Sequence, residues 1–248
     1  MFPVDLLQGK VALVTGASSE TGPTIARTFG EVGADVALTY LTRAESAEKV
    51  VSEVEANGVR AKAYRFDLLE IDTIKPLVDE VVADFGRLDF LINCAATRLS
   101  PPVKELHFSD WDHCVDGNLK ACFFLARDAA QVMEAGDGGA VVNFSATSAM
   151  KYSHSVYGLA KAAVISMTRF LASTFAPKVR VNCIIPGLID NPEYGIEGRR
   201  KRAADTPLGR IVNARDLGLM CVAMCSPLFE TVTGEAVIMD GGFWLKHV

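Results

Sequence analysis

The fold is decided by the stretch Lys10-Val11-Ala12-Leu13-Val14-Thr15-Gly16-Ala17-Ser18-Ser19-Glu20-Thr21-Gly22-Pro23. The apolar run from Lys10 to Thr15 predicts a buried strand. Pro23 is typical of the first turn of a helix, where its missing N–H costs little. The small residues between them predict a tight turn. In a strand–turn–helix unit, such a turn directs backbone N–H groups and the helix N-terminus toward a pyrophosphate, so this segment predicts a dinucleotide site.

The rest of the chain repeats the alternation of strand and helix. Further strands are expected at 35–40, 60–66, 88–93, 140–144, 179–185 and 236–239. Helices are expected at 22–32, 44–56, 71–85, 109–133, 156–175 and 214–225. This alternation predicts βαβ units with right-handed crossovers, and hence an α/β fold: a Rossmann-type, doubly wound parallel sheet with helices on both faces. We expect one domain over 1–248, with the charged, Gly- and Pro-containing segment 188–207 as an irregular lid over the carboxyl edge of the sheet.

Composition excludes several classes of protein. The 248 residues are 50% hydrophobic and 22% charged, which is typical of a globular domain. The net charge of −5 argues against nucleic-acid binding. Neither a signal-peptide pattern nor an apolar run of about 20 residues is seen, so we expect a soluble, cytoplasmic protein without a membrane partner. The six cysteines include no C-x-x-C pair and the four histidines are scattered, which predicts buried reduced thiols and no metal site.

Short motifs follow one another in a fixed order along the chain. They are Thr15-Gly16 with Gly22, Asn93-Cys94-Ala95-Ala96, Asn118, Tyr157-x-x-x-Lys161, Pro186-Gly187 and Asp240-Gly241-Gly242. From about residue 8 to 243 the chain therefore resembles the short-chain dehydrogenase/reductase family, and its length and layout resemble the 3-oxoacyl reductase branch. The resemblance implies a homotetramer or homodimer, formed through the helices at 109–133 and 156–175 and the C-terminal segment.

The resemblance also implies where a cofactor would bind. Its pyrophosphate would lie along the turn, at Gly16, Ser18, Thr21 and Gly22. Asp67 and Leu68 would flank the adenine, Asn93 and Ala95 the adenosine ribose, and Pro186, Gly187 and Ile189 the nicotinamide. The strand at 35–40 is followed by Leu41-Thr42-Arg43, without the acidic residue that holds the ribose hydroxyls of NAD. NADP is therefore preferred over NAD, and Arg43 either meets the 2′-phosphate or is a solvated residue at the start of the next helix.

The chemistry is expected at Tyr157 and Lys161. Four residues apart, they stand on one face of a helix. A nearby ammonium favours the phenolate and lowers the pKa of a tyrosine, which can then act as acid or base at a carbonyl or alcohol. By resemblance, both residues would also contact the cofactor, with Lys161 holding the nicotinamide ribose. Asn118 would keep a water near the lysine.

Two departures from the family pattern affect this expectation. Glu20 stands at the middle glycine of the turn, where a carboxylate either repels a pyrophosphate or points to solvent. Ala146 stands at the place of the serine that orients the carbonyl. Ser145, Thr147 and Ser148 are the possible replacements, and Ser148 is marginally favoured. Tyr152 and His154 either line the same pocket or are solvated loop residues.

Two functions from different classes remain open. The first is an NADP(H)-dependent carbonyl reductase or alcohol dehydrogenase acting on a 3-oxoacyl thioester, a cyclic ketone or a polyketide-like ketone. The second is a binding or scaffold protein with little or no redox activity, a hypothesis motivated by Glu20 and Ala146. The basic run 199–202 is the exposed face of a lid helix or a surface that attracts an acidic substrate.

Overall fold

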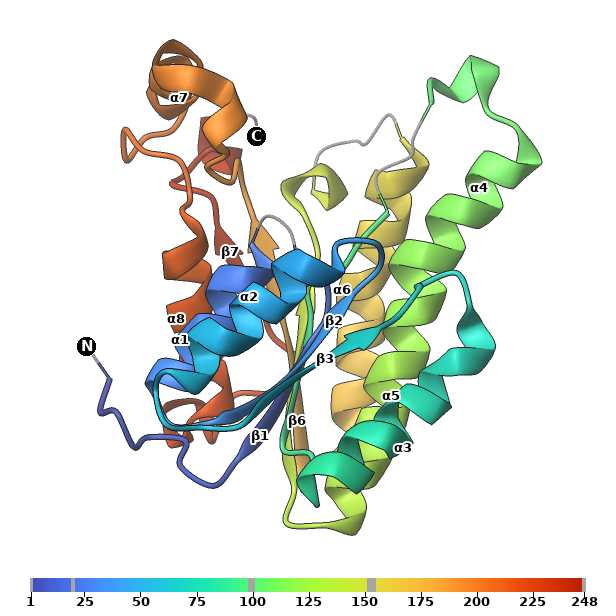
Figure 1. The fold of residues 1–248 in the computed structure, drawn as a ribbon. Coiled ribbons are helices and arrows are strands. Elements are labelled where there is room, and N and C mark those ends of the chain that lie inside the picture. Colours follow the sequence, from blue (N-terminus) through green and yellow to red (C-terminus); the bar gives the residue numbers. More distant parts are fainter. Residues whose placement is uncertain (1, 19–20, 98–100, 151–154, 247–248) are drawn as a thin grey trace.

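A parallel β-sheet forms the middle layer of the molecule. The computed structural model describes residues 2–18, 21–97, 101–150 and 155–246. Over these ranges the sheet has seven strands in the order β3-β2-β1-β4-β5-β6-β7, and every neighbouring pair is parallel (Figure 1). The strands are β1 Val11–Val14, β2 Asp35–Tyr40, β3 Ala61–Arg65, β4 Phe90–Asn93, β5 Gly139–Phe144, β6 Val179–Pro186 and β7 Ala236–Met239. The predicted doubly wound sheet is confirmed.

Helices cover both faces of this sheet (Figure 1). One face carries α1 (Gly22–Glu31), α2 (Ala44–Glu55) and α8 (Ala214–Cys225). The other carries α3 (Ile74–Phe85), α5 (Ala121–Ala135) and α6 (Val156–Phe175), with α4 (Phe108–Val115) packed against α6. Alternate residues of a strand point to opposite faces. Ala12 and Val14 therefore pack in the core beneath α1, α2 and α8, while Val11 and Leu13 pack in the core beneath α3, α5 and α6. Burial on both faces explains why β1 is apolar throughout.

The structure corrects two of the expected elements. The single helix predicted over 109–133 is instead α4, a π-helical turn at Asp116–Lys120, and α5. The predicted lid, 188–207, is more regular than expected, because it contains the short turn η5 (Pro192–Tyr194) and helix α7 (Gly195–Ala204). The remaining boundaries differ by a few residues, as with β4, which begins at Phe90 rather than at 88. None of the helices within the described ranges is long and apolar enough to cross a bilayer.

A buried carboxylate ties β1 to β4 at the end of the sheet opposite the carboxyl edge. Asp89 is 2% exposed and accepts hydrogen bonds from the Val11 backbone N–H at 2.9 Å, Lys10 Nζ at 3.1 Å and Arg87 Nε at 2.7 Å. Burial opposes its ionised form, but these three donors outweigh that effect and lower the pKa of Asp89. The ionised carboxylate therefore stabilises the fold.

We expect Asp89→Asn to lower the free energy of unfolding by about 1.5–3 kcal/mol at neutral pH, because hydrogen bonds to a charged group are lost. The folded-state pKa lies below the unfolded value of about 3.9. The stabilisation is thus fully present above that value and is lost as the pH falls through the folded pKa. Urea unfolding at several pH values should show that the free energies of unfolding of the wild type and of Asp89→Asn become equal in acid. The control is Asp137→Asn, because the Asp137 side chain pairs with the same Arg87 but is 75% exposed. A difference that is constant with pH contradicts the assignment.

Candidate functional site

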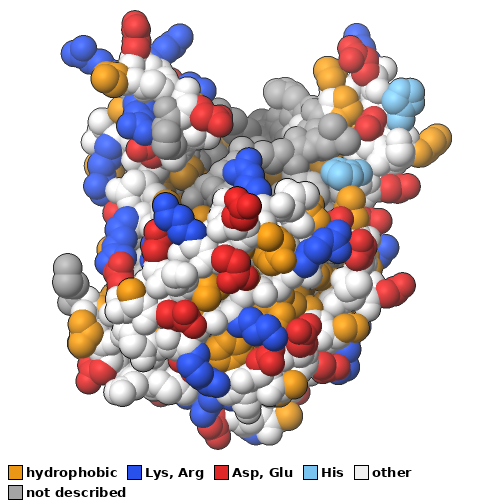
Figure 2. Space-filling view, in the orientation of Figure 1, with side chains coloured by type: hydrophobic (Ala, Val, Ile, Leu, Met, Phe, Trp, Pro, Cys, Tyr) orange, Lys and Arg blue, Asp and Glu red, His pale blue; other side chains and the backbone are white. Residues whose placement is uncertain are grey.

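A cavity of about 430 Å³ opens at the carboxyl ends of the strands. Figure 2 shows the molecule hollowed there, between the lobe that carries α7 and the lobe that carries α4. The strand order reverses between β1 and β4, and such a switch point is where open α/β sheets bind their ligands. Twelve of the residues predicted from the sequence line this cavity: Gly16, Ser18, Thr21, Gly22, Arg43, Asp67, Leu68, Ala95, Tyr157, Lys161, Pro186 and Ile189.

The turn after β1 forms one wall of the cavity. Gly16 has a φ of +72°, and its N–H donates to Thr39 Oγ1 at 3.1 Å, which anchors the turn to β2. Helix α1 begins at Gly22, and a Cβ there would lie 2.3 Å from the carbonyl oxygen of Gly16. The turn and the first turn of α1 are therefore in direct backbone contact, a packing that only glycine allows. Glu20 lies outside the described residues.

The far end of the cavity is formed by the loops after β2 and β3. Arg43 precedes α2, is exposed, and lines the cavity together with Leu41 and Thr42. Asp67 accepts a hydrogen bond from the Leu69 N–H at 2.9 Å, which shapes the loop after β3. Sequence reasoning missed several wall residues: Thr39, Tyr40, Leu41, Thr42, Phe66, Ala96, Thr97 and Phe144. Most of them follow the end of a strand, and that position is the signal that predicts them.

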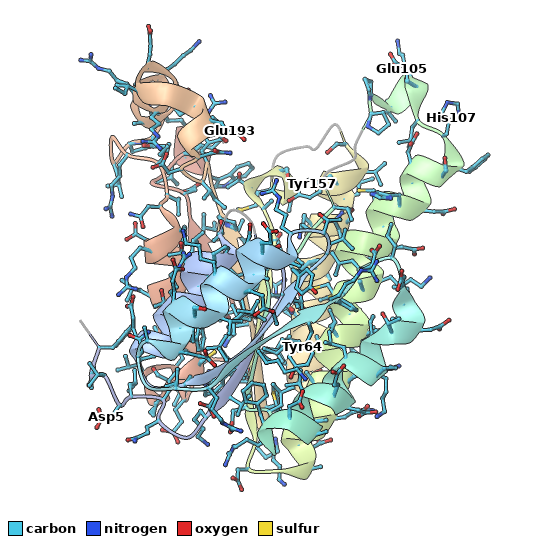
Figure 3. All side chains as sticks on the ribbon, viewed as in Figure 1. Asp5, Tyr64, Glu105, His107, Tyr157 and Glu193 are labelled. Carbon is cyan, nitrogen blue, oxygen red and sulfur yellow. The ribbon has the colours of Figure 1, made fainter. Side chains whose placement is uncertain are left out.

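The opposite end of the cavity holds Tyr157 and Lys161, both on α6. Tyr157 points into the hollow between the two lobes (Figure 3). Lys161 Nζ lies 5.6 Å from the centre of the Tyr157 ring and donates to the carbonyl oxygen of Phe144 at 2.9 Å. The Ser155 hydroxyl caps the helix by accepting from the Gly158 N–H at 3.2 Å. The two side chains predicted to carry the chemistry are thus brought together at the cavity wall.

Lys161 is buried, and burial lowers its pKa below the ordinary value. The titratable groups that influence its pKa are the thiols of Cys122, Cys183, Cys94 and Cys114. Burial raises the pKa of Cys122 to about 12 and that of Cys183 to about 11. These two thiols therefore stay protonated at neutral pH and carry no charge beside Lys161.

Three predicted residues lie behind the cavity wall. Asn118 sits in the π-helical turn, where its amide donates to the Thr97 carbonyl oxygen at 2.9 Å and its Oδ1 has no partner among the described residues. Asn93 donates to the Cys122 carbonyl oxygen at 3.1 Å and to Asn143. A Cβ on Gly187 would lie 2.5 Å from Asp240, so this glycine permits a close backbone approach. Contacts of these three residues with a cofactor stay predictions.

The three hydroxyls named as replacements for the one absent at Ala146 have different surroundings. Ser145 lines the cavity, and its Oγ donates to the Lys161 carbonyl oxygen at 2.7 Å. Ser148 has a buried Oγ without a hydrogen-bond partner among the described residues. Thr147 begins the short turn η4 (Thr147–Ala149) and is half-buried. Tyr152 and His154 lie outside the described residues.

Residues 188–207, the predicted lid, contain two contacts made by their own cations. Arg199 Nε lies 2.8 Å from Asp190 Oδ1, and the Arg202 guanidinium stacks 4.1 Å from the centre of the Tyr194 ring. Arg200 and Lys201 are exposed. Figure 3 shows Glu193 on the same lobe, across the hollow from Glu105. The basic run therefore has two exposed cations, Arg200 and Lys201, and two cations, Arg199 and Arg202, that contact residues of the same segment. Attraction of an acidic substrate by this run stays a prediction.

Comparison with known proteins gives consistent matches over almost the whole chain. A family model described as enoyl-(acyl carrier protein) reductase matches residues 16–244. An NADP-dependent mannitol dehydrogenase of Hypocrea jecorina is 32% identical, over 96% of this chain and 93% of its own. A 3-oxoacyl-[acyl-carrier-protein] reductase of Staphylococcus aureus is 31% identical, over 95% and 98%. The crystal structure of a Burkholderia cenocepacia short chain dehydrogenase in complex with NADP has a TM-score of 0.89 and 32% identity, over 96% and 99%.

Proposed function

We propose that this chain, which belongs to the short-chain dehydrogenase/reductase family, transfers a hydride between NADP(H) and a carbonyl or alcohol substrate. One observation carries the proposal: a single cavity joins a glycine turn and Arg43 at one end to Tyr157 and Lys161 at the other. The first end suits a phosphate-bearing dinucleotide and the second suits a carbonyl. The NADP-dependent relative and the NADP-bound neighbour support the choice of cofactor.

In this proposal each residue has a physical task. The bound cofactor supplies or accepts the hydride. Tyr157 donates its hydroxyl proton to the carbonyl oxygen during reduction and takes it back in the reverse direction. The Lys161 ammonium, 5.6 Å from the ring centre, stabilises the phenolate that remains. Asn118, behind the wall, serves the relay that returns a proton to the tyrosine.

The cofactor is proposed to lie along the cavity with its adenine near Arg43. Its pyrophosphate would lie on the turn, at Gly16, Ser18, Thr21 and Gly22, which presents backbone N–H groups and the start of α1. The other contacts are proposed as in the family: Asp67 and Leu68 at the adenine, Asn93 and Ala95 at its ribose, Pro186, Gly187 and Ile189 at the nicotinamide, and Tyr157 and Lys161 at the nicotinamide ribose.

Arg43 is expected to select NADPH over NADH. Arg43→Ala should raise the Kd for NADPH about 10- to 100-fold, because a charge-assisted contact with the 2′-phosphate is lost. The Kd for NADH should change little. Titration followed by cofactor fluorescence measures both. Lys49→Ala is the matched control, since Lys49 is an exposed cation on α2, the helix that Arg43 precedes, and does not line the cavity. An equal rise of the Kd for NADPH and of the Kd for NADH would show that Arg43 does not select between the two cofactors.

For the substrate, we propose a 3-oxoacyl thioester or a polyketide-like ketone, with residues 188–207 as the lid that selects it. The similarity to the Staphylococcus aureus reductase supports the thioester. A panel with NADPH should compare a 3-oxoacyl pantetheine thioester, an aromatic cyclic ketone and a ketose. We expect the thioester or the cyclic ketone to give the highest kcat/KM. Turnover of the ketose alone would overturn the proposed substrate class, although it would still support an oxidoreductase activity.

A binding or scaffold protein is the alternative from another class. The absence of a side-chain hydroxyl at Ala146 favours it, because one electrostatic donor to the carbonyl is commonly worth a few kcal/mol of transition-state stabilisation. Tyr157 and Lys161 favour the enzyme, because burying a lysine that donates to a neutral carbonyl oxygen, that of Phe144, has a cost that a purely structural role does not explain. Ser148 is proposed as the replacement donor, since its hydroxyl has no partner among the described residues.

A cytoplasmic homotetramer or homodimer is proposed as the state in which the protein works. The exposed Phe170 of α6, which stacks on Phe123 of α5 with 6.3 Å between ring centres, supports an interface on these helices. Light scattering that gives a monomer would contradict it.

A further inference from the structure

The end of β5 and helix α6 are joined by two reciprocal hydrogen bonds at the catalytic lysine. Lys161 Nζ donates to the carbonyl oxygen of Phe144 at 2.9 Å, and Ser145 Oγ donates to the carbonyl oxygen of Lys161 at 2.7 Å. Ser145 and Lys161 are each 3% exposed. The side chain and the backbone of Lys161 are therefore both fixed to the same two residues of the strand end.

A second polar contact joins the same strand and helix deeper in the fold. Asn143 Nδ2 donates to Thr168 Oγ1 at 3.0 Å, and Thr168 Oγ1 donates to the Val164 carbonyl oxygen at 2.8 Å. Asn143 and Ser145 are two residues apart and face the same side of the sheet. Lys161 and Thr168 are seven residues apart, about two helical turns, and share a face of α6. The two contacts together fix the position of α6 along the direction of β5. Of the two, the Ser145 contact is the one that lies at the cavity.

The Ser145 hydroxyl has a single proton, and that proton is directed to the Lys161 carbonyl oxygen. Although Ser145 lines the cavity, it cannot donate to a substrate carbonyl while this bond is made. We infer that Ser145 is a positioning residue, which holds the helical turn bearing Lys161 at the end of β5 and so sets the place of the Lys161 ammonium relative to the Tyr157 ring. This inference rests on the proposed function.

The position of Lys161 matters because its interaction with the phenol depends on distance. An ammonium that moves away from the tyrosine stabilises the phenolate less. The thiols of Cys122 and Cys183, which influence the buried Lys161, stay protonated at neutral pH, so neither of them makes up for a displacement. Loss of the Ser145 hydroxyl should therefore change how the reaction depends on pH, which a purely structural contact would not do.

The test compares Ser145→Ala, Ser145→Thr and Thr168→Val in the full chain, with kcat and KM measured against pH and thermal unfolding measured alongside. For Ser145→Ala we expect kcat to fall about tenfold, the midpoint of the pH profile to move upward and the KM of the carbonyl substrate to stay within about twofold. Ser145→Thr keeps the hydroxyl and should restore the midpoint. Thr168→Val removes the deeper contact, and should lower the melting temperature without moving the midpoint.

Two outcomes overturn the inference. The first is a Ser145→Ala protein whose pH profile coincides with that of the wild type. The second is a loss that differs from one carbonyl substrate to another with the pH midpoint unmoved, which would make Ser145 a donor to the substrate. Tyr157→Phe separates this inference from the proposed function. If Tyr157→Phe is inactive while Ser145→Ala leaves the pH profile unchanged, only the role of Ser145 fails. If Tyr157→Phe is fully active, the proposed function fails.

Discussion

Tyr157→Phe is expected to lower kcat for carbonyl reduction by about 10²- to 10⁴-fold, the usual contribution of a positioned general acid. The substitution removes one oxygen atom and keeps the ring that Lys161 Nζ approaches to 5.6 Å. NADPH should therefore still bind, with a Kd within a few-fold of that of the unaltered protein. Steady-state kinetics measure the first effect, and titration followed by cofactor fluorescence measures the second.

The matched control for this experiment is Tyr64→Phe. Tyr64 lies on β3, away from the cavity, and its hydroxyl donates to Asp84 Oδ2 at 2.7 Å. Its loss should lower stability by about 0.5–1.5 kcal/mol and leave kcat unchanged. If Tyr157→Phe retained most of the activity, the tyrosine would not be the acid. If it also retained the biological role undiminished, the scaffold hypothesis would be favoured.

Gly22→Val is expected to abolish the NADPH-dependent thermal shift. A Cβ at Gly22 would lie 2.3 Å from the Gly16 carbonyl oxygen and 2.9 Å from the Ala17 Cα, both of them backbone atoms that cannot rotate away. The turn must then separate from α1, which disrupts the N–H groups proposed to hold the pyrophosphate. Overpacking of this kind also costs about 1–3 kcal/mol of stability.

Gly136→Ala is the control for that substitution. A Cβ there would meet no heavy atom closer than 3.6 Å, and the backbone φ is −97°. We expect it to bind NADPH normally. Circular dichroism shows whether Gly22→Val is folded. A folded Gly22→Val protein that binds NADPH as tightly as the control would show that the turn does not hold the cofactor.

Much of the fold is predictable because it follows from periodicity. Strands such as Val11–Val14 are buried on both faces, so they are continuous apolar runs, and amphipathic helices such as Ala44–Glu55 separate them. The π-helical turn at Asp116–Lys120 was not predictable, because one extra residue in a helical turn leaves the polarity pattern almost unchanged. Helix α7 was missed because it has no buried residue and hence no apolar stripe.

The site was predictable where it depends on position along a strand, and less so where it depends on side-chain contacts. Gly16 and Arg43 follow strands, and the topology brings such residues to one edge. The different surroundings of Ser145 and Ser148 depend on where α6 packs, and this position cannot be predicted from the pattern of residues along the chain. Asn93 shows the same limit, since its amide is directed toward Cys122 and Asn143 beneath the cavity wall.

A titration of the purified protein with NADPH and, separately, with NADH shows whether the cavity binds a dinucleotide. Cofactor fluorescence and thermal shift are followed together, so that binding is measured in two independent ways. We expect tight NADPH binding with a rise in melting temperature, and weaker NADH binding with a smaller rise. Binding of neither cofactor would contradict this expectation, because the cavity between Arg43 and Tyr157 would then not hold a dinucleotide.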